Sequence, residues 1–169
     1  MDTGLLILRL VLGLLMAAHG AQKLFGWFGG PGLVGVGGMF ESLGFRPGRL
    51  FAAVAATSEI GSGVLMALGL LGSIGPALLL SVMIVAAVSV HAPHGLFAVS
   101  NGIEIPLLYG IGAAALTLTG PGQYSLDALF GLTFLSTSPV SWAALAAGIL
   151  GGIANLALRR RPVAAPTAA

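Results

Sequence analysis

Five apolar stretches, separated by glycine- and proline-rich segments, run along the 169 residues of this chain. They lie at residues 5–25, 50–71, 73–90, 103–119 and 140–158. A helix needs about 17–25 mostly apolar residues to cross a lipid bilayer, so each stretch is long enough to span one. The pattern predicts an all-α integral membrane helix bundle, with a four-helix core plus a fifth C-terminal transmembrane helix.

The segments between these stretches predict loops and short interfacial helices. Residues 26–48 hold many glycines, which weaken a helix, so we expect only a short interfacial helix at residues 39–45. Residues 30–35 match a dinucleotide-binding pattern, but that motif needs a preceding strand, and here it follows a membrane helix. The apolar run at residues 128–135 is too short to span and is expected at the interface. The predicted division is a four-helix bundle with interfacial loops at residues 1–139, an additional transmembrane helix at residues 140–161 and a disordered tail at residues 162–169.

The first apolar stretch can also be interpreted as a cleavable signal peptide. Residues 18–20 resemble a cleavage site, but Asp2 stands where a signal peptide carries basic residues. The apolar run is also longer than the usual hydrophobic region of a signal peptide. We therefore expect the first helix to be retained.

Composition and charge support a membrane protein and exclude several functions. Hydrophobic residues make up 57% of the chain and charged residues only 7%, whereas a soluble domain carries about 25% charged residues. The net charge of +2 comes without a basic face, which argues against nucleic acid as a partner. The chain has no cysteine, so disulfides, thiol relays and thiolate-bound clusters are excluded.

Basic residues near the ends of the stretches predict the orientation in the membrane. Lys and Arg accumulate in cytoplasmic loops, so the arginines at residues 159–161 place the C-terminus in the cytoplasm. Five spans then put the N-terminus outside and the loop with Lys23, Arg46 and Arg49 inside. The loop at residues 120–139 has no Lys or Arg and falls outside.

Ionisable side chains inside the apolar stretches are the candidate functional residues. A charged group in the hydrocarbon layer costs a few kcal/mol and therefore faces other helices, water or a ligand. His19 and Lys23 in the first helix and Glu59 in the second lie at similar predicted depth. We expect them to point at each other or into one shared cavity, which Glu104 approaches from the fourth helix. These four are the candidates for ligand binding or proton relay.

Four further polar residues are secondary candidates, for which a purely structural role is the alternative. Arg9 should lie apart, near the outer border, because about ten residues, or 15 Å, separate it from His19. Gln22 adjoins the helix face that carries His19. Tyr124 and Asp127 follow a helix-breaking segment, where the carboxylate can simply accept backbone N–H groups of a turn. For the four main candidates a structural role is also possible, since ion pairs among them can serve only to neutralise buried charge.

No metal site is expected from the sequence. His91 and His94 are two potential ligands on one loop, which do not make a site by themselves. The Glu-x-x-His pattern of di-iron helix bundles is absent after both Glu59 and Glu104.

Several of these residues together resemble the DoxX family of small bacterial membrane proteins. The resemblance covers roughly residues 4–127 and depends on an ordered set of short motifs. The set comprises Arg9-Leu10 with Gly13, His19-Gly20-x-x-Lys23, Phe40 with Leu43-Gly44, Glu59 with Gly61 and Gly63, Leu68-Gly69, and Gly120-Pro121-Gly122-x-Tyr124-Ser125-Leu126-Asp127. Members of the family look like four-helix membrane bundles, so the fifth stretch goes beyond the family pattern.

The resemblance implies a role in membrane redox biology, since the family is named for a subunit of a thiosulfate:quinone oxidoreductase. Other members are associated with oxidative-stress and thiol-homeostasis systems. It implies an accessory or quinone-interacting subunit in the bacterial cytoplasmic (inner) membrane, with quinone as the candidate cofactor. The expected partners are the lipid bilayer and a membrane or peripheral redox protein. Whether the protein forms an oligomer stays an open question. Two alternatives remain: a small proton-coupled transporter, and a non-catalytic scaffold or assembly protein that docks helices through its small residues.

Overall fold

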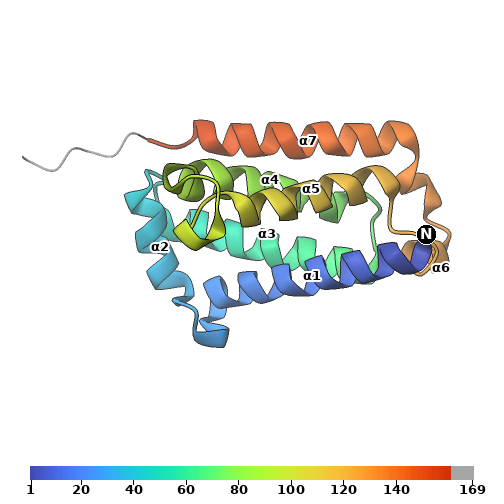
Figure 1. The fold of residues 1–169 in the computed structure, drawn as a ribbon, viewed down its shortest axis with the longest axis horizontal. Coiled ribbons are helices and arrows are strands. Elements are labelled where there is room, and N and C mark those ends of the chain that lie inside the picture. Colours follow the sequence, from blue (N-terminus) through green and yellow to red (C-terminus); the bar gives the residue numbers. More distant parts are fainter. Residues whose placement is uncertain (161–169) are drawn as a thin grey trace, which may run out of the picture.

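The computed structural model describes residues 1–160, and five long helices lie side by side in this part of the chain (Figure 1). The predicted disordered tail at residues 162–169 lies outside the described residues. The long helices are α1 (Asp2–Phe25), α3 (Gly48–Leu68), α4 (Ile74–Ala86), α5 (Glu104–Thr119) and α7 (Ser138–Ala157). The short helix α2 (Gly32–Ser42) crosses one end of the bundle and α6 (Leu126–Phe130) lies at the other. We call these the α2 end and the α6 end.

The predicted all-α membrane bundle is confirmed. Within residues 1–160, four helical segments are long and apolar enough to cross a membrane. They are α1, α3, α7 and the continuous segment Ile74–His94, which extends α4 through a π-helical turn. The fourth predicted span, residues 103–119, corresponds to α5, which has 16 residues. At 1.5 Å per residue α5 is about 24 Å long, somewhat shorter than the roughly 30 Å hydrocarbon core of a bilayer.

Helix α2 corrects one prediction, because it begins at Gly32 instead of residue 39. Its glycines are tolerated because they let the helix approach the start of α3. A Cβ atom added at Gly37 would lie 2.9 Å from Arg49 Cγ, and one added at Gly48 would overlap the carbonyl oxygen of Gly37. Close packing therefore compensates for the poor helix propensity of glycine. The run at residues 128–135 forms a short helix and a 3₁₀ turn that cannot span, as predicted.

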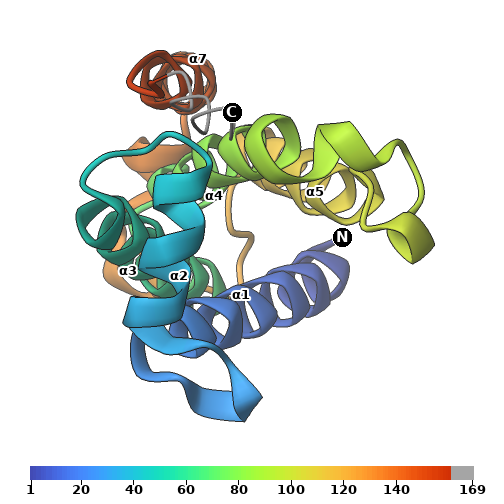
Figure 2. The ribbon, with the colours of Figure 1, turned by 90° about the vertical axis from the view of Figure 1, so that its left-hand side faces the viewer.

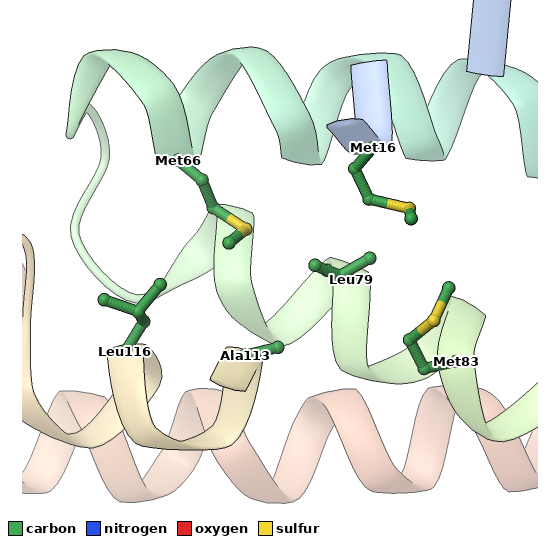
Figure 3. Close-up of a cluster of buried hydrophobic side chains, with 6 residues drawn as sticks. All are labelled: Met16, Met66, Leu79, Met83, Ala113 and Leu116. Carbon is green, nitrogen blue, oxygen red and sulfur yellow. The ribbon is translucent and has the colours of Figure 1, made fainter. Parts of the chain in front are cut away.

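The hydrophobic core lies where α1, α3, α4 and α5 meet (Figure 3). Three methionines with flexible thioether side chains fill much of this space. The buried cluster consists of Met16, Met66, Leu79, Met83, Ala113 and Leu116. None of these residues comes from α7, which lies outside the other long helices in Figure 2. The arrangement confirms a four-helix core with a fifth helix added to it.

Helices α1 and α3 are in direct backbone contact along a seam of small residues. A Cβ atom added at Gly13 would lie 2.5 Å from the carbonyl oxygen of Gly63, and the converse distance is also 2.5 Å. One added at Gly20 would lie 2.6 Å from the carbonyl oxygen of Ala56. Small residues of this kind allow membrane helices to approach closely. The seam fixes the register of α1 against α3.

Helix α7 is docked on α4 through the glycines predicted for helix packing. A Cβ atom at Gly148 would lie 2.5 Å from the carbonyl oxygen of Ala77, and one at Gly152 would lie 2.9 Å from Ile84 Cβ. At the α2 end the backbone N–H of Arg160 donates to the carbonyl of Gly44 at 2.9 Å. The fifth helix is therefore packed along its length and fastened to the loop that follows α2.

The α1–α3 seam can be tested with two glycines of the same helix. Gly63→Ala should destabilise the protein by about 1–3 kcal/mol, because the added methyl group overlaps the α1 backbone. Gly61→Ala is the matched control: nothing lies within 4 Å of its added Cβ, and alanine favours the helix by up to about 1 kcal/mol. The measurement is the midpoint of unfolding in detergent. Equal midpoints for the two variants would contradict the seam.

Candidate functional site

A buried ion pair joins α1 to the middle of α3. The Nζ atom of Lys23 donates to Oε1 of Glu59, and this is the only salt bridge among residues 1–160. The side chain of Glu59 is 1% exposed and that of Lys23 is 28% exposed. The second carboxylate oxygen of Glu59, Oε2, is also buried but has no hydrogen-bond partner. A buried polar atom without a hydrogen-bond partner lowers the stability of the fold, and a ligand or water molecule that donates to this oxygen would remove that cost.

Beside this pair lies a cavity of about 330 Å³ between α2, α3 and α4. Most of its wall is apolar, and Lys23 and Glu59 contribute to it together. The other polar lining residues are Ser58, Ser81, Ser89, His91 and Asn155. A largely apolar cavity with a few polar groups is typical of small-molecule sites, whose volumes run from about 300 to 1,000 Å³.

A π-helical turn at Ala87–His91 forms part of the cavity wall. The hydroxyl of Ser89 donates to the carbonyl of Val85 at 2.5 Å, and the imidazole Nδ1 of His91 lies 2.8 Å from the carbonyl oxygen of Asn101. Single π turns inside α-helices occur frequently at functional sites. The sequence predicts a loop at His91 and does not single out Ser89, because no local sequence pattern distinguishes a π turn from the end of an α-helix.

His19 does not join the ion pair, which corrects the predicted shared site. Its exposed side chain is absent from the cavity wall, and its ring stands edge-on to Tyr109 of α5, with centroids 6.4 Å apart. The physical reason is the helix face that α1 uses. Gly20 lies in the α1–α3 seam, and the preceding residue is rotated by about 100° from it. Lys23 still reaches Glu59 because its side chain is long.

Glu104 and Gln22 also lie outside the cavity. Glu104 is the first residue of α5, and its Oε2 atom accepts the backbone N–H of Ala98 at 2.7 Å. It therefore orders the loop before α5 instead of approaching Glu59, because the free N–H group at the start of the 3₁₀ turn Ala98–Ser100 lies within its reach. Gln22 donates through Nε2 to the carbonyl of Phe28 at 3.5 Å, at the turn after α1.

The secondary candidates Arg9 and Asp127 lie at the α6 end, and Arg9 is apart from the ion pair as expected. Asp127 accepts the backbone N–H of Leu71 at 2.9 Å through Oδ1 and that of Gly72 through Oδ2. Both turn residues have left-handed backbone angles, with φ of 62° and 57°. The carboxylate therefore holds the tight turn between α3 and α4, in line with the structural alternative. Tyr124 is 60% exposed.

Within residues 1–160, no three His, Cys, Asp or Glu side chains lie close enough together to form a metal site. The charged groups of the candidate site are the ammonium of Lys23 and the carboxylate of Glu59, and the wall beside them is mostly apolar.

The ion pair can be tested by removing one partner or both. Lys23→Met should destabilise the protein by up to about 3–5 kcal/mol, because it leaves a buried carboxylate without its counter-charge. The double variant Lys23→Met/Glu59→Met should recover most of that loss, since no charge is then buried. Unfolding midpoints in detergent give the comparison. A double variant that is no more stable than Lys23→Met would contradict the pairing.

Comparison with known proteins places the chain in a family. A search of curated proteins and a search of solved structures returned no match. The DoxX family model matches residues 4–92, which is over half of the chain. The matched segment includes α1, α3, α4, the π turn and both residues of the ion pair, whereas the resemblance seen in the motifs extends to residue 127. The chain belongs to the DoxX family and is a multi-pass membrane protein.

Proposed function

We propose that this DoxX family protein binds a quinone-type ligand in the cavity beside Lys23 and Glu59, as an accessory subunit of a membrane redox system. The observation that carries the proposal is the buried Oε2 atom of Glu59, which has no partner. It belongs to a residue that lines a largely apolar cavity. A ligand with an apolar ring and polar edge groups suits both parts of such a site.

The two charged groups supply complementary hydrogen bonding. The Lys23 ammonium has donors only, and its Nζ can donate to a ligand carbonyl as well as to Oε1 of Glu59. The ionised carboxylate has acceptors only, so Oε2 suits a hydroxyl group of a reduced ring. A carboxylate within hydrogen-bond reach of such a hydroxyl is also a suitable proton acceptor. The site can therefore hold a ligand and exchange a proton with it. The carboxylate takes a proton from the reduced ring when the electrons of the ring pass to a partner protein, and it returns the proton when the partner reduces the oxidised ring.

The position of the cavity supports access from the membrane. Val54 of α3 lines the cavity and is 46% exposed. In a bilayer, an exposed apolar residue on a spanning helix faces lipid. An apolar ligand dissolved in the membrane can therefore approach at this point, without crossing the aqueous border.

The distribution of basic residues supports the bacterial inner membrane with the α2 end in the cytoplasm. Lys23 is in the last turn of α1, and Arg46 and Arg49 lie in the loop after α2 and in the first turn of α3. Arg159 and Arg160 follow α7, where Arg160 is hydrogen-bonded to the loop after α2. The only arginine in the α6 half of the described chain is Arg9, and it is buried. Positive residues accumulate on the cytoplasmic side, so this arrangement puts the N-terminus outside and the end of α7 inside.

Binding of a short-chain hydroquinone to the purified full chain in detergent tests the proposal. Glu59→Gln should weaken hydroquinone binding about tenfold, because a hydrogen bond to a charged group contributes about 1.5–3 kcal/mol. Glu104→Gln is the matched control, since Glu104 accepts a hydrogen bond outside the cavity. Equilibrium titration gives the dissociation constants, and unfolding midpoints show that each variant is folded.

Absence of binding to the wild-type protein would reject the proposed function. Equal loss of affinity in Glu59→Gln and Glu104→Gln would also reject it, because the cavity would then have no special part in binding.

A further inference from the structure

A second hollow lies at the α6 end, remote from the ion pair. Its volume is about 520 Å³, and Arg9, Gln123, Tyr124 and Ser125 line it together with apolar residues such as Leu68 and Leu129. Arg9 precedes Lys23 by 14 positions on α1, which corresponds to about 21 Å along the helix. The two sites are therefore separate.

The Arg9 side chain is buried and has unused donors. It is 3% exposed, and its Nε and Nη1 atoms have no hydrogen-bond partner. The guanidinium lies against the end of α3, where a Cβ atom at Gly69 would overlap Nη1. The negative end of the α3 dipole favours a cation here, but it takes up none of these directional donors.

The nearby acid, Asp127, does not occupy these donors either. Its charge acts on Arg9, but its two oxygens accept the backbone N–H groups of Leu71 and Gly72. No salt bridge joins Arg9 to Asp127 within the described residues. The guanidinium thus has a carboxylate charge in its surroundings but keeps N–H groups that no protein atom accepts.

The polar side chains that line the hollow can all donate hydrogen bonds, and no aspartate or glutamate is among them. The hydroxyl of Ser125 is already engaged, since it donates to the carbonyl of Gly122 at 2.5 Å and accepts the N–H of Ala128 at 3.1 Å. The remaining polar side chains are Arg9, Gln123 and Tyr124, all of which can donate. A donor-rich wall around a buried guanidinium suits an oxyanion, which arginine binds in a bidentate manner.

We propose that Arg9, Tyr124 and Gln123 form a binding site for a phosphate group at the α6 end of the bundle. The phosphate is either that of a phospholipid headgroup or a free ion. The apolar part of the wall, where Leu129 is 73% exposed and Leu68 45% exposed, provides a surface for the chains of a lipid. Tyrosine is enriched at this level of membrane proteins, at the border between lipid and water.

The experiment uses the full chain in a detergent without phosphate, titrated separately with inorganic phosphate, dihexanoyl phosphatidylglycerol and dihexanoyl phosphatidylcholine. Binding of the lipids with no binding of inorganic phosphate identifies the headgroup as the source. Binding of inorganic phosphate identifies the free ion. Arg9→Gln should weaken binding about tenfold or more, since it removes a charge-assisted hydrogen bond.

Two loop variants keep the test decisive if Arg9→Gln does not fold. Tyr124→Phe and Gln123→Leu change side chains on an irregular segment outside the helices, and each should weaken binding by a few-fold. Arg46→Gln removes the same charge from an exposed position at the α2 end and should leave the affinity unchanged. No binding in any titration, or equal affinities for Arg46→Gln and the three site variants, would overturn the proposal.

Discussion

The backbone contact between α1 and α3 is the constraint on which the rest of the structure depends. Gly13 and Gly63 leave no room for a side chain between the two helices, so the helices meet in one register. That register brings Lys23 opposite Glu59 and lays Arg9 over the end of α3 at Gly69. The positions of Arg9 and Lys23 are thus set by contacts between residues that carry no charge.

The buried charges of Glu59 and Arg9, near the two ends of α1, are compensated in different ways. At Glu59 a directed ion pair offsets the charge but leaves one carboxylate oxygen unpaired beside a cavity. At Arg9 the offset is diffuse, from Asp127 and the α3 terminus, and the guanidinium keeps unpaired N–H groups beside a hollow. A buried charge with incomplete hydrogen bonding lowers the stability of the fold. A bound ligand would supply the missing hydrogen bonds, and for this reason we propose a ligand site at each of the two positions.

The sequence was sufficient to predict the five long helices and part of the candidate site. Apolar length indicated the spanning segments, and the cost of a charge in lipid indicated that Glu59 needs a partner. It was not sufficient to choose between His19 and Lys23 as that partner. They are four residues apart and share a helix face, yet His19 contacts Tyr109 instead. The packing of Gly20 against α3 sets the rotation of α1, and with that rotation only the longer side chain of Lys23 reaches Glu59.

What the sequence determined by itself is therefore the class of protein. A stretch of about 20 residues with very few charges is a local property of the sequence, and it is the property that a lipid bilayer requires of a spanning helix. The start of α2, the π turn at Ala87–His91, the inward position of His91 and the cavity were decided only by the tertiary structure. Each of these depends on contacts between segments far apart in the chain. Glycines that predict a loop in isolation become helical when a neighbouring backbone covers them, and a cavity exists only where several helices fail to fill the space between them.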